Sequence, residues 1–286
     1  MTRFPRLSEP LALPPLRLAN RVTRAPLFTA LATAEGLVSL PMLTHYGELA
    51  QGGASMVVVA NGLVDPAGSL SPRSLRVDHD RCLPGLRRLA GAIRTHGAAA
   101  VLQLNHGGRY ARSANPVAPS PVPLSEGNLL DLWRSTLQAP DLEQQLAVVG
   151  EGLQLLARRP APLTQEAIRA VQARYARAAW RARQAGFDMV ELHGANGYLP
   201  VQFLSRRTNR RRDRYGGSLA NRMRFFLELF DAVRAAVGPG FPVGCRLMVE
   251  EWMPGGVGLE ESLVLAEHLA RRGAAYLSLT AGTYES

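Results

Sequence analysis

The feature that most constrains the fold is a repeated alternation between short apolar runs and longer amphipathic segments. Six runs rich in Val, Leu and other apolar residues are predicted to be strands, at 21–26, 55–60, 100–104, 189–192, 243–247 and 276–280. Helical spacing of apolar residues occupies most of the intervals, at 41–51, 81–96, 164–185, 219–237 and 259–272. Strands that alternate with helices are joined by crossovers and run parallel. The sequence therefore predicts an α/β protein, preceded by a small hairpin at 11–13 and 16–18.

Two architectures fit this alternation, an open doubly wound sheet and a (β/α)8 TIM barrel. The segment from Arg24 to Leu31, after the first strand, contains no glycine, so the glycine-rich turn that binds a dinucleotide in the open sheet is missing. The barrel is therefore favoured, and a barrel domain uses roughly 200 to 400 residues. Residues 1–286 are predicted to form one domain, although only about six of the eight barrel strands are present.

A long excursion separates the third strand from the next helix. Residues 105–163 are rich in proline, serine and glycine, with a leucine-bearing stretch at 142–156. Loops of this length inside a compact domain are uncommon and are usually functional or mobile. We expect the excursion to shape a binding pocket.

The charge of the chain excludes some functions. The net charge is +10 and every one of the 33 basic residues is arginine. Without lysine, the chain has neither a Schiff-base lysine nor a P-loop lysine. The arginines are scattered rather than gathered in one patch, so we expect neither a nucleic-acid partner nor a membrane partner.

The cysteines and the N-terminal sequence indicate a compartment. Cys82 and Cys245 are too few and too far apart for a disulfide framework or a cysteine-rich metal site, so no metal ligands are predicted. Both are interpreted as small buried hydrophobic residues. No apolar run is long enough to span a bilayer, and the expected location is cytoplasmic.

The stretch from Met189 to Tyr198, MVELHGANGY, carries the most concentrated chemistry. A buried strand is followed within six residues by His193, Asn196 and Tyr198, with glycines between them. The carboxyl ends of parallel strands are where ligands and catalytic groups gather. The sequence therefore predicts a site at this end of the strand.

Several motifs, in order along nearly the whole chain, resemble one known family. They are Asn-Arg-x-x-x-x-Pro at 20–26, Gln-Leu-x-His-x-Gly-Arg at 103–109, His-x-x-Asn-x-Tyr at 193–198, and Asn-Arg-Arg-x-Asp-x-Tyr-Gly-Gly-Ser at 209–218. Together they resemble the Old Yellow Enzyme family of FMN-dependent NAD(P)H oxidoreductases, which includes ene-reductases and the barrel domain of 2,4-dienoyl-CoA reductases. The resemblance implies a TIM barrel with FMN across its carboxyl-terminal mouth and NADH or NADPH as the reductant.

The resemblance also implies which residues contact the flavin. The backbone at Pro26, Leu27, Phe28 and Thr29 is expected along the isoalloxazine edge, Asn61 against the ring, and Gln103 and Arg246 at the pyrimidine side. Two positions depart from the family pattern, because Phe28 stands where many members have Cys or Thr and Asn61 stands where a small Ala or Gly is usual. A guanidinium beside the pyrimidine ring stabilises the anionic reduced flavin.

The same resemblance assigns catalytic roles. His193 and Asn196 are expected to hydrogen-bond the carbonyl oxygen of an activated alkene, such as an enone or an enoyl thioester. Tyr198 is expected to donate the proton that complements hydride transfer from the flavin. Homo-oligomers are also possible.

Other interpretations of these residues stay open. His193 and Tyr198 can be satisfied core groups, His106 can hold the loop at Gly107 and Gly108, and 209–218 can be a structural turn, which is the interpretation we favour for it. As a whole, the chain can be a non-catalytic or unstable partial barrel that needs a partner or a missing C-terminal segment. A flavin-free barrel acting on phosphorylated sugars is disfavoured by the absence of lysine.

The end of the chain also carries an expectation. The resemblance assigns phosphate binding to the seventh and eighth strands, which lie beyond Ser286. We expect the natural polypeptide to continue past this residue with the two remaining strands and their glycine-rich turns. Whether the parent protein also carries an iron-sulfur cluster is left open.

Overall fold

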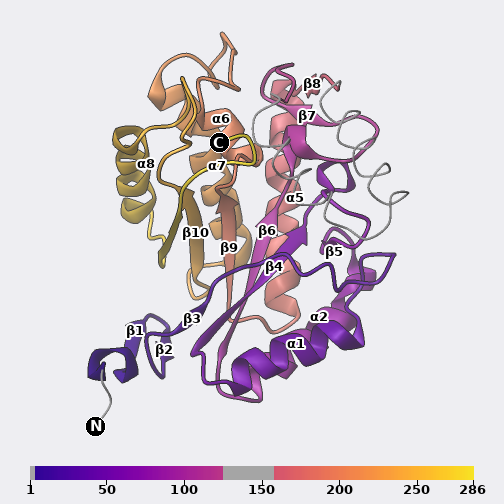
Figure 1. Cartoon of the computed structure of the whole chain (residues 1–286), viewed down its shortest axis with the longest axis vertical. Coiled ribbons are helices and arrows are strands. Elements are labelled where there is room, and N and C mark those ends of the chain that lie inside the picture. The colour runs from indigo at the N-terminus through magenta and orange to yellow at the C-terminus, as the bar shows by residue number, and fades with distance from the viewer. Residues whose placement is uncertain (1–3, 125–157) are drawn as a thin grey trace, which may run out of the picture.

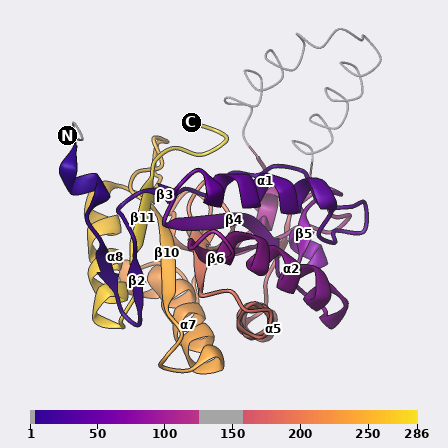
Figure 2. The same cartoon turned by 90° about the horizontal axis from the view of Figure 1, so that it is seen from below.

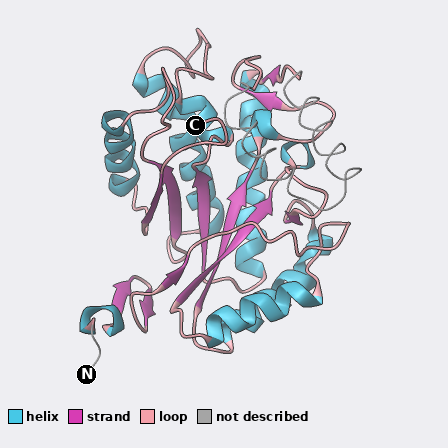
Figure 3. Ribbon diagram, in the orientation of Figure 1, coloured by secondary structure: helices cyan, strands magenta, loops and turns pink. Residues whose placement is uncertain are grey.

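Six parallel strands form one curved sheet, a half-barrel, in the computed structural model, which describes residues 4–124 and 158–286. The strand order follows the chain order, and a short strand, β5, is added beside β4. The arrowheads of the long strands of this sheet point toward the end of the molecule that carries the C-terminal turn (Figure 3). The strands are β3 (Thr23–Arg24), β4 (Met56–Leu63), β5 (Leu75–Arg76), β6 (Ala99–Asn105), β9 (Met189–Gly194), β10 (Val243–Met248) and β11 (Leu277–Thr280).

Helices cover the outer face of this sheet (Figure 2). Each packs against the next in chain order, as expected when every crossover has the same hand. The order is α1 (Leu40–Gln51), α2 (Leu83–Arg94), α5 (Gln165–Gln184), α7 (Leu219–Val237) and α8 (Leu259–Arg271), with a short helix α6 (Leu199–Leu204) after β9. Ser39, Thr164 and Ser218 begin α1, α5 and α7 by accepting a backbone N–H with their side chains.

The strands divide their side chains between two faces because successive residues of a strand point in opposite directions. One set faces the helices and is apolar throughout, and it forms the main core with them. These residues are Val57, Val59, Ala100, Leu102, Leu104, Val190, Leu192, Val243, Cys245 and Leu247. The hydrophobic effect therefore fixes which residues turn inward, and the inward set is free to be polar.

The inward face becomes more polar from the amino ends of the strands toward their carboxyl ends. At the amino end Met56, Val58, Val101 and Met189 form a second apolar cluster with the N-terminal hairpin. That hairpin, β1 (Leu11–Leu13) paired with β2 (Leu16–Leu18), lies at the end of the molecule opposite the C-terminal turn (Figure 1). The amino end of the inner face is thereby covered with apolar side chains, and polar groups are confined to the other end.

The fold expected from the sequence is confirmed, with local differences. All six predicted strands and five helices are present, and the 81–96 segment begins with a 3-10 turn, η3 (Asp80–Cys82), ahead of α2. The sequence analysis missed α6 and the short parallel pair of β7 (Val117–Ala118) and β8 (Ala161–Pro162), which joins the two ends of the 105–163 excursion. The leucine-bearing stretch at 142–156 falls outside the described residues. Within residues 4–124 and 158–286, no helix is long and apolar enough to cross a membrane.

Candidate functional site

The end of β9 brings His193, Asn196 and Tyr198 into one small region. His193 and Tyr198 are almost fully buried, and their rings meet edge to face with centroids 4.8 Å apart. Between them the chain turns through Asn196 and Gly197, both with positive φ, at 56° and 76°. Asparagine tolerates this left-handed conformation better than most residues. The turn therefore places three polar side chains over the end of a single strand.

Two buried atoms of this region have no partner in the part of the chain that the structure describes. They are His193 Nδ1 and Asn196 Oδ1, and neither has a hydrogen bond within residues 4–124 and 158–286. Buried polar atoms are almost always satisfied, so each exception needs an explanation. A polar ligand at this strand end would supply it.

The environment sets the protonation of both titratable groups. Burial, together with the positive charge of Arg246, lowers the pKa of His193 to about 3. The imidazole is therefore neutral at physiological pH and can donate one N–H without carrying a charge. Burial also raises the pKa of Tyr198 well above its ordinary value, and the neighbouring Tyr284 adds to this rise. Tyr198 is accordingly a protonated phenol that can donate.

Gln103 lies one layer below His193 on the inner face. It is paired in register with Glu191 of β9, and its Nε2 donates to Glu191 Oε1 at 2.7 Å. The hydroxyl of Tyr276 donates to the other oxygen of Glu191, also at 2.7 Å. The sequence analysis singled out neither Glu191 nor Tyr276.

Arg246 lies level with His193. The two residues pair in register across β9 and β10, and Arg246 Nη1 donates to the hydroxyl of Ser278 on β11 at 2.8 Å. Because the guanidinium has five N–H donors, one bond to Ser278 leaves further donors for a ligand. Gln103, His193 and Arg246 thus belong to three adjacent strands of one inner face.

The remaining predicted residues belong to the first two strands. Pro26, Leu27, Phe28 and Thr29 follow the end of β3, and the side chains of Leu27 and Phe28 are exposed. Asn61 is buried in β4, where the register with β6 shifts between Val59 and Gly62. These residues share the carboxyl edge of the sheet with His193, but no hydrogen bond joins them to the β9 group within the described residues.

The C-terminal turn supplies a residue that the sequence analysis missed. The hydroxyl of Tyr284 is 2.6 Å from that of Tyr198, and the two rings are 5.9 Å apart. The next residue, Glu285, anchors the turn: Tyr110 donates to it at 2.6 Å, Arg207 binds both of its oxygens, and Arg109 forms an ion pair with it. No local pattern points to Tyr284, because its contact with Tyr198 spans 86 residues of sequence.

Two conspicuous motifs have structural roles. The Nδ1 of His106 accepts the backbone N–H of Gly108 at 3.0 Å, so this histidine holds the glycine loop. The side chain of Asn209 donates to the carbonyl oxygens of Phe203 and Tyr215 at 2.6 and 2.7 Å and ties the 209–218 turn to α6. Both observations agree with the structural interpretation of these segments.

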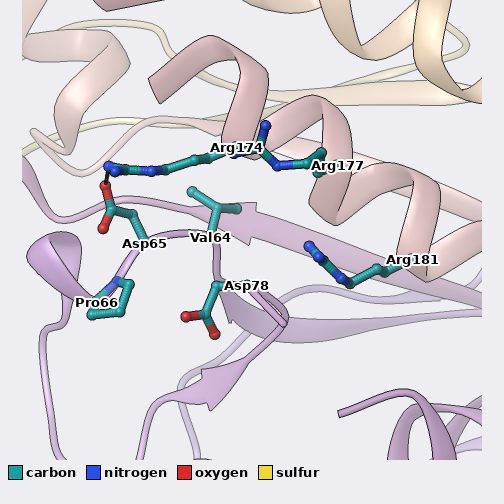
Figure 4. A pocket seen from close by; sticks show the side chains of 7 residues that line it. All are labelled: Val64, Asp65, Pro66, Asp78, Arg174, Arg177 and Arg181. Carbon is teal, nitrogen blue, oxygen red and sulfur yellow. Dashed lines mark hydrogen bonds and ion pairs between the residues drawn. The ribbon is translucent and has the colours of Figure 1, made fainter. Parts of the chain in front are cut away.

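A cavity of about 130 Å³ lies between α5 and the segment after β4, and Figure 4 shows it closely. Arg174, Arg177 and Arg181 reach it from one face of α5, opposite Asp65 and Asp78. Most of this charge is neutralised by ion pairs. Asp65 pairs with Arg174 within the cavity lining, and Asp78 and Arg181 each pair with a residue outside it. None of the residues predicted to be functional lines this cavity.

A half-barrel with polar groups at the carboxyl ends of its strands defines an α/β-barrel protein of the kind that binds a ligand at the barrel mouth. Comparison with known proteins gives the family. The profile of the NADH:flavin oxidoreductase / NADH oxidase family matches residues 6–282, and the chain belongs to this family. FMN is the family's flavin, and NADH or NADPH is its reductant.

Individual relatives agree with this assignment. The chain is 36% identical to the NADH oxidase of Thermoanaerobacter brockii over 292 residues, which cover all of this chain and 40% of that protein. A solved complex of 2-naphthoyl-CoA reductase has a TM-score of 0.85 and 26% identity, and the match covers 99% of this chain and 41% of that one. Morphinone reductase in complex with tetrahydroNAD has a TM-score of 0.77 and 31% identity, with 96% and 73% covered. The chain thus spans about two fifths of the length of the NADH oxidase that it matches.

The residues at the barrel mouth fit a flavin. A flavin ring presents a polar pyrimidine edge, and Gln103 and Arg246 offer an amide and a guanidinium on adjoining layers of the same face. His193 Nδ1 and Asn196 Oδ1 have no hydrogen-bond partner among the described residues, and a polar ligand bound at this end of the barrel would supply one. The N–H donors of Gln103 and Arg246 suit an anionic or carbonyl-rich ligand, whereas Asn196 Oδ1 can only accept a hydrogen bond.

Proposed function

We propose that the chain is the flavin-binding part of an NAD(P)H-dependent oxidoreductase that reduces activated alkenes. The observation that carries this proposal is the meeting of His193, Asn196 and Tyr198 at the end of β9, beside Arg246 on β10. FMN, when bound, supplies the hydride that it has received from NADH or NADPH. The protein residues bind and orient the substrate and deliver a proton.

We assign cofactor binding to the residues that the family resemblance implies. Gln103 and Arg246 are assigned to the pyrimidine side of FMN. The segment Pro26, Leu27, Phe28 and Thr29 and the side chain of Asn61 are assigned to the rest of the ring, at the same carboxyl edge of the sheet. The positive charge of Arg246 favours the anionic reduced form of the cofactor.

The substrate carbonyl is assigned to His193 and Asn196. A neutral imidazole N–H and a side-chain amide are two donors that polarise a conjugated carbonyl, and they stabilise the negative charge that develops on its oxygen. Since the low pKa of His193 keeps the ring uncharged, this stabilisation should persist throughout the neutral pH range. Activated alkenes such as enones and enoyl thioesters carry this carbonyl, and the similarity to a reductase in complex with 2-naphthoyl-CoA supports the thioester class.

Tyr198 is assigned as the proton donor. Its phenol is protonated at neutral pH, since its pKa is raised, and Tyr284 accepts from or donates to it at 2.6 Å. This hydrogen bond holds the Tyr198 hydroxyl in one orientation, and the contact with Tyr284 favours the protonated form of the phenol. We further propose a cytoplasmic location, because Cys82 and Cys245 are both buried and unpaired.

The test separates the two half-reactions by anaerobic stopped-flow spectroscopy of the full-length protein with FMN bound. Tyr198→Phe is expected to slow alkene reduction by about 100-fold or more and to leave flavin reduction by NAD(P)H unchanged, because only the first step needs the proton. Tyr175→Phe is the matched control, since the hydroxyl of this buried tyrosine on α5 has no hydrogen-bond partner among the described residues. Equal slowing of both half-reactions would remove Tyr198 from this role, and a protein that takes up no FMN would refute the function.

A further inference from the structure

Glu191 is a buried carboxylate to which the proposed reaction gives no part. Its exposed fraction is 0%, and it faces the inside of the half-barrel rather than the helices. A buried charge is costly unless it is paired or hydrogen-bonded. Here two donors, Gln103 Nε2 and the Tyr276 hydroxyl, each bind one of its oxygens at 2.7 Å. Such an arrangement needs a purpose that offsets the cost of burial.

The arrangement spans four neighbouring strands and depends on a glycine. Glu191 is in register with Gln103 on one side and with Gly244 on the other. The ring of Tyr276 occupies the space where Gly244 would have a side chain, because a Cβ built there would lie 2.2 Å from a ring carbon of Tyr276. The missing side chain lets Tyr276, just before β11, reach across β10 to a carboxylate on β9.

Hydrogen-bond chemistry then determines how Gln103 is turned. A carboxylate only accepts, so Gln103 must direct its nitrogen toward Glu191. The amide oxygen and the second N–H of Gln103 remain for another partner. The pyrimidine edge of a flavin carries an N–H between two carbonyl oxygens, which matches one acceptor and one donor side by side. If the amide were reversed, its oxygen would face the carboxylate and this match would be lost.

The pKa of Glu191 is raised above its ordinary value, and the groups around the carboxyl act against that rise. Burial raises the pKa of Glu191, but the hydrogen bonds from Tyr276 and Gln103 and the positive charge of Arg246 oppose that rise. The two donors thus favour the acceptor-only form on which the orientation of Gln103 depends.

We infer that Glu191 is a positioning residue, which fixes the Gln103 amide in the orientation that binds the pyrimidine edge of FMN and is itself held by Tyr276. This inference rests on the proposed function, because Gln103 acts on the flavin only if FMN occupies the barrel mouth. Glu191 touches neither substrate nor reacting atoms in this role.

A double-mutant cycle on FMN affinity tests the inference. The dissociation constant of FMN is measured on the full-length apoprotein by quenching of flavin fluorescence, for wild type, Glu191→Gln, Gln103→Ala and the double variant. Glu191→Gln can donate its new amide to Gln103 and turn it around, so affinity is expected to fall about tenfold, the worth of one hydrogen bond. The double variant is expected to bind FMN no more weakly than Gln103→Ala alone, because Glu191 acts through Gln103.

The chain offers a matched control for the loss of a carboxylate. Glu228 also accepts from a glutamine and a tyrosine, Gln172 at 3.2 Å and Tyr215 at 2.7 Å, but it lies among the helices outside the barrel. Glu228→Gln should leave FMN affinity unchanged. A loss as large as that of Glu191→Gln would assign the effect to general destabilisation and overturn the inference.

Tyr276→Phe keeps the test decisive if Glu191→Gln does not fold. It removes one donor to Glu191 without altering Gln103, and a several-fold weaker affinity for FMN is expected only when Gln103 is present. Two results would refute the positioning role while leaving the proposed function intact. In the first, Glu191→Gln or Tyr276→Phe weakens FMN binding by the same factor in the Gln103→Ala background as in the wild type. In the second, Glu191→Gln and Tyr276→Phe both bind FMN with wild-type affinity. A wild-type protein that does not bind FMN would refute both.

Discussion

Replacing Glu285 by glutamine should destabilise the protein more than any exposed carboxylate change. The Glu285 side chain is fully buried, and it bridges Arg109 and Arg207 while Tyr110 donates to it. Glu285→Gln keeps the shape but removes the negative charge between the buried guanidinium of Arg109 and the partly buried one of Arg207. Removing one partner of a buried ion pair costs about 3–5 kcal/mol.

The lower end of that range applies here. Arg207 also lies 3.4 Å from Glu251, so it retains one counter-charge after the substitution, whereas the ion pair of Arg109 is lost. We therefore expect Glu285→Gln to lower the free energy of unfolding by about 3 kcal/mol. The matched control is Glu267→Gln, which breaks an exposed ion pair with Arg271 and should cost no more than about 0.5 kcal/mol.

Urea unfolding of the full-length protein measures both variants, with the midpoint and the slope fitted separately. A difference of less than about 1 kcal/mol between Glu285→Gln and Glu267→Gln would contradict the reasoning. It would show that the arginines recover water or other partners once the charge is gone, and that the C-terminal turn is not held by this network.

Four further outcomes are expected. His193→Ala should weaken binding of phenol-like ligands. In the wild type, the affinity plotted against pH should show no inflection from His193 between about pH 5 and 8, because burial lowers the pKa of His193 to about 3. An inflection near pH 6.5 that disappears in His193→Ala would contradict this. The same shift makes the stability contributed by His193 complete above about pH 6.5 and progressively lost toward pH 3, since the unfolded chain takes up the proton first. Tyr284→Phe should slow alkene reduction several-fold and leave flavin reduction unchanged, because it removes the 2.6 Å hydrogen bond to Tyr198. Unchanged rates in stopped-flow measurements would show that Tyr284 does not assist Tyr198. Gly194→Ala should lower the free energy of unfolding by about 1–3 kcal/mol, because its Cβ would lie 2.3 Å from a ring carbon of Phe226, and a melt at the wild-type temperature would refute this.

The elements that were predictable from sequence are those encoded by local periodicity. The apolar run at 55–60 and the helical pattern at 164–185 are local, and both elements form, although the strand extends to Leu63. Glu191 shows the limit of this reasoning. One acid in an apolar strand signals only that the inner face is polar there, and its partners come from β6 and the start of β11, 88 and 85 residues away in sequence.

The candidate site was predictable to a similar extent. Three of its residues, His193, Asn196 and Tyr198, lie at or just after the end of a single strand, so the carboxyl-end rule for parallel sheets places them together. Tyr284 was not predictable in this way, because its position depends on how Glu285 is captured by arginines of distant segments. Interactions that are set by the tertiary fold leave no periodic trace in the sequence.

The division of each strand into a helix-facing set and an inward set limits how such a chain can diverge. In β9 the inward residues Met189, Glu191 and His193 alternate with Val190 and Leu192, which pack against the helices. Deleting a single residue within this strand would exchange the two sets, driving a carboxylate and an imidazole into the apolar layer and turning valine and leucine toward the cofactor side. Point substitutions of alternate residues can alter the chemistry while the fold persists, but a change of length inside a strand cannot. Insertions and deletions are therefore expected only in connections such as 105–163, and new activities should arise there or by replacement of inward residues.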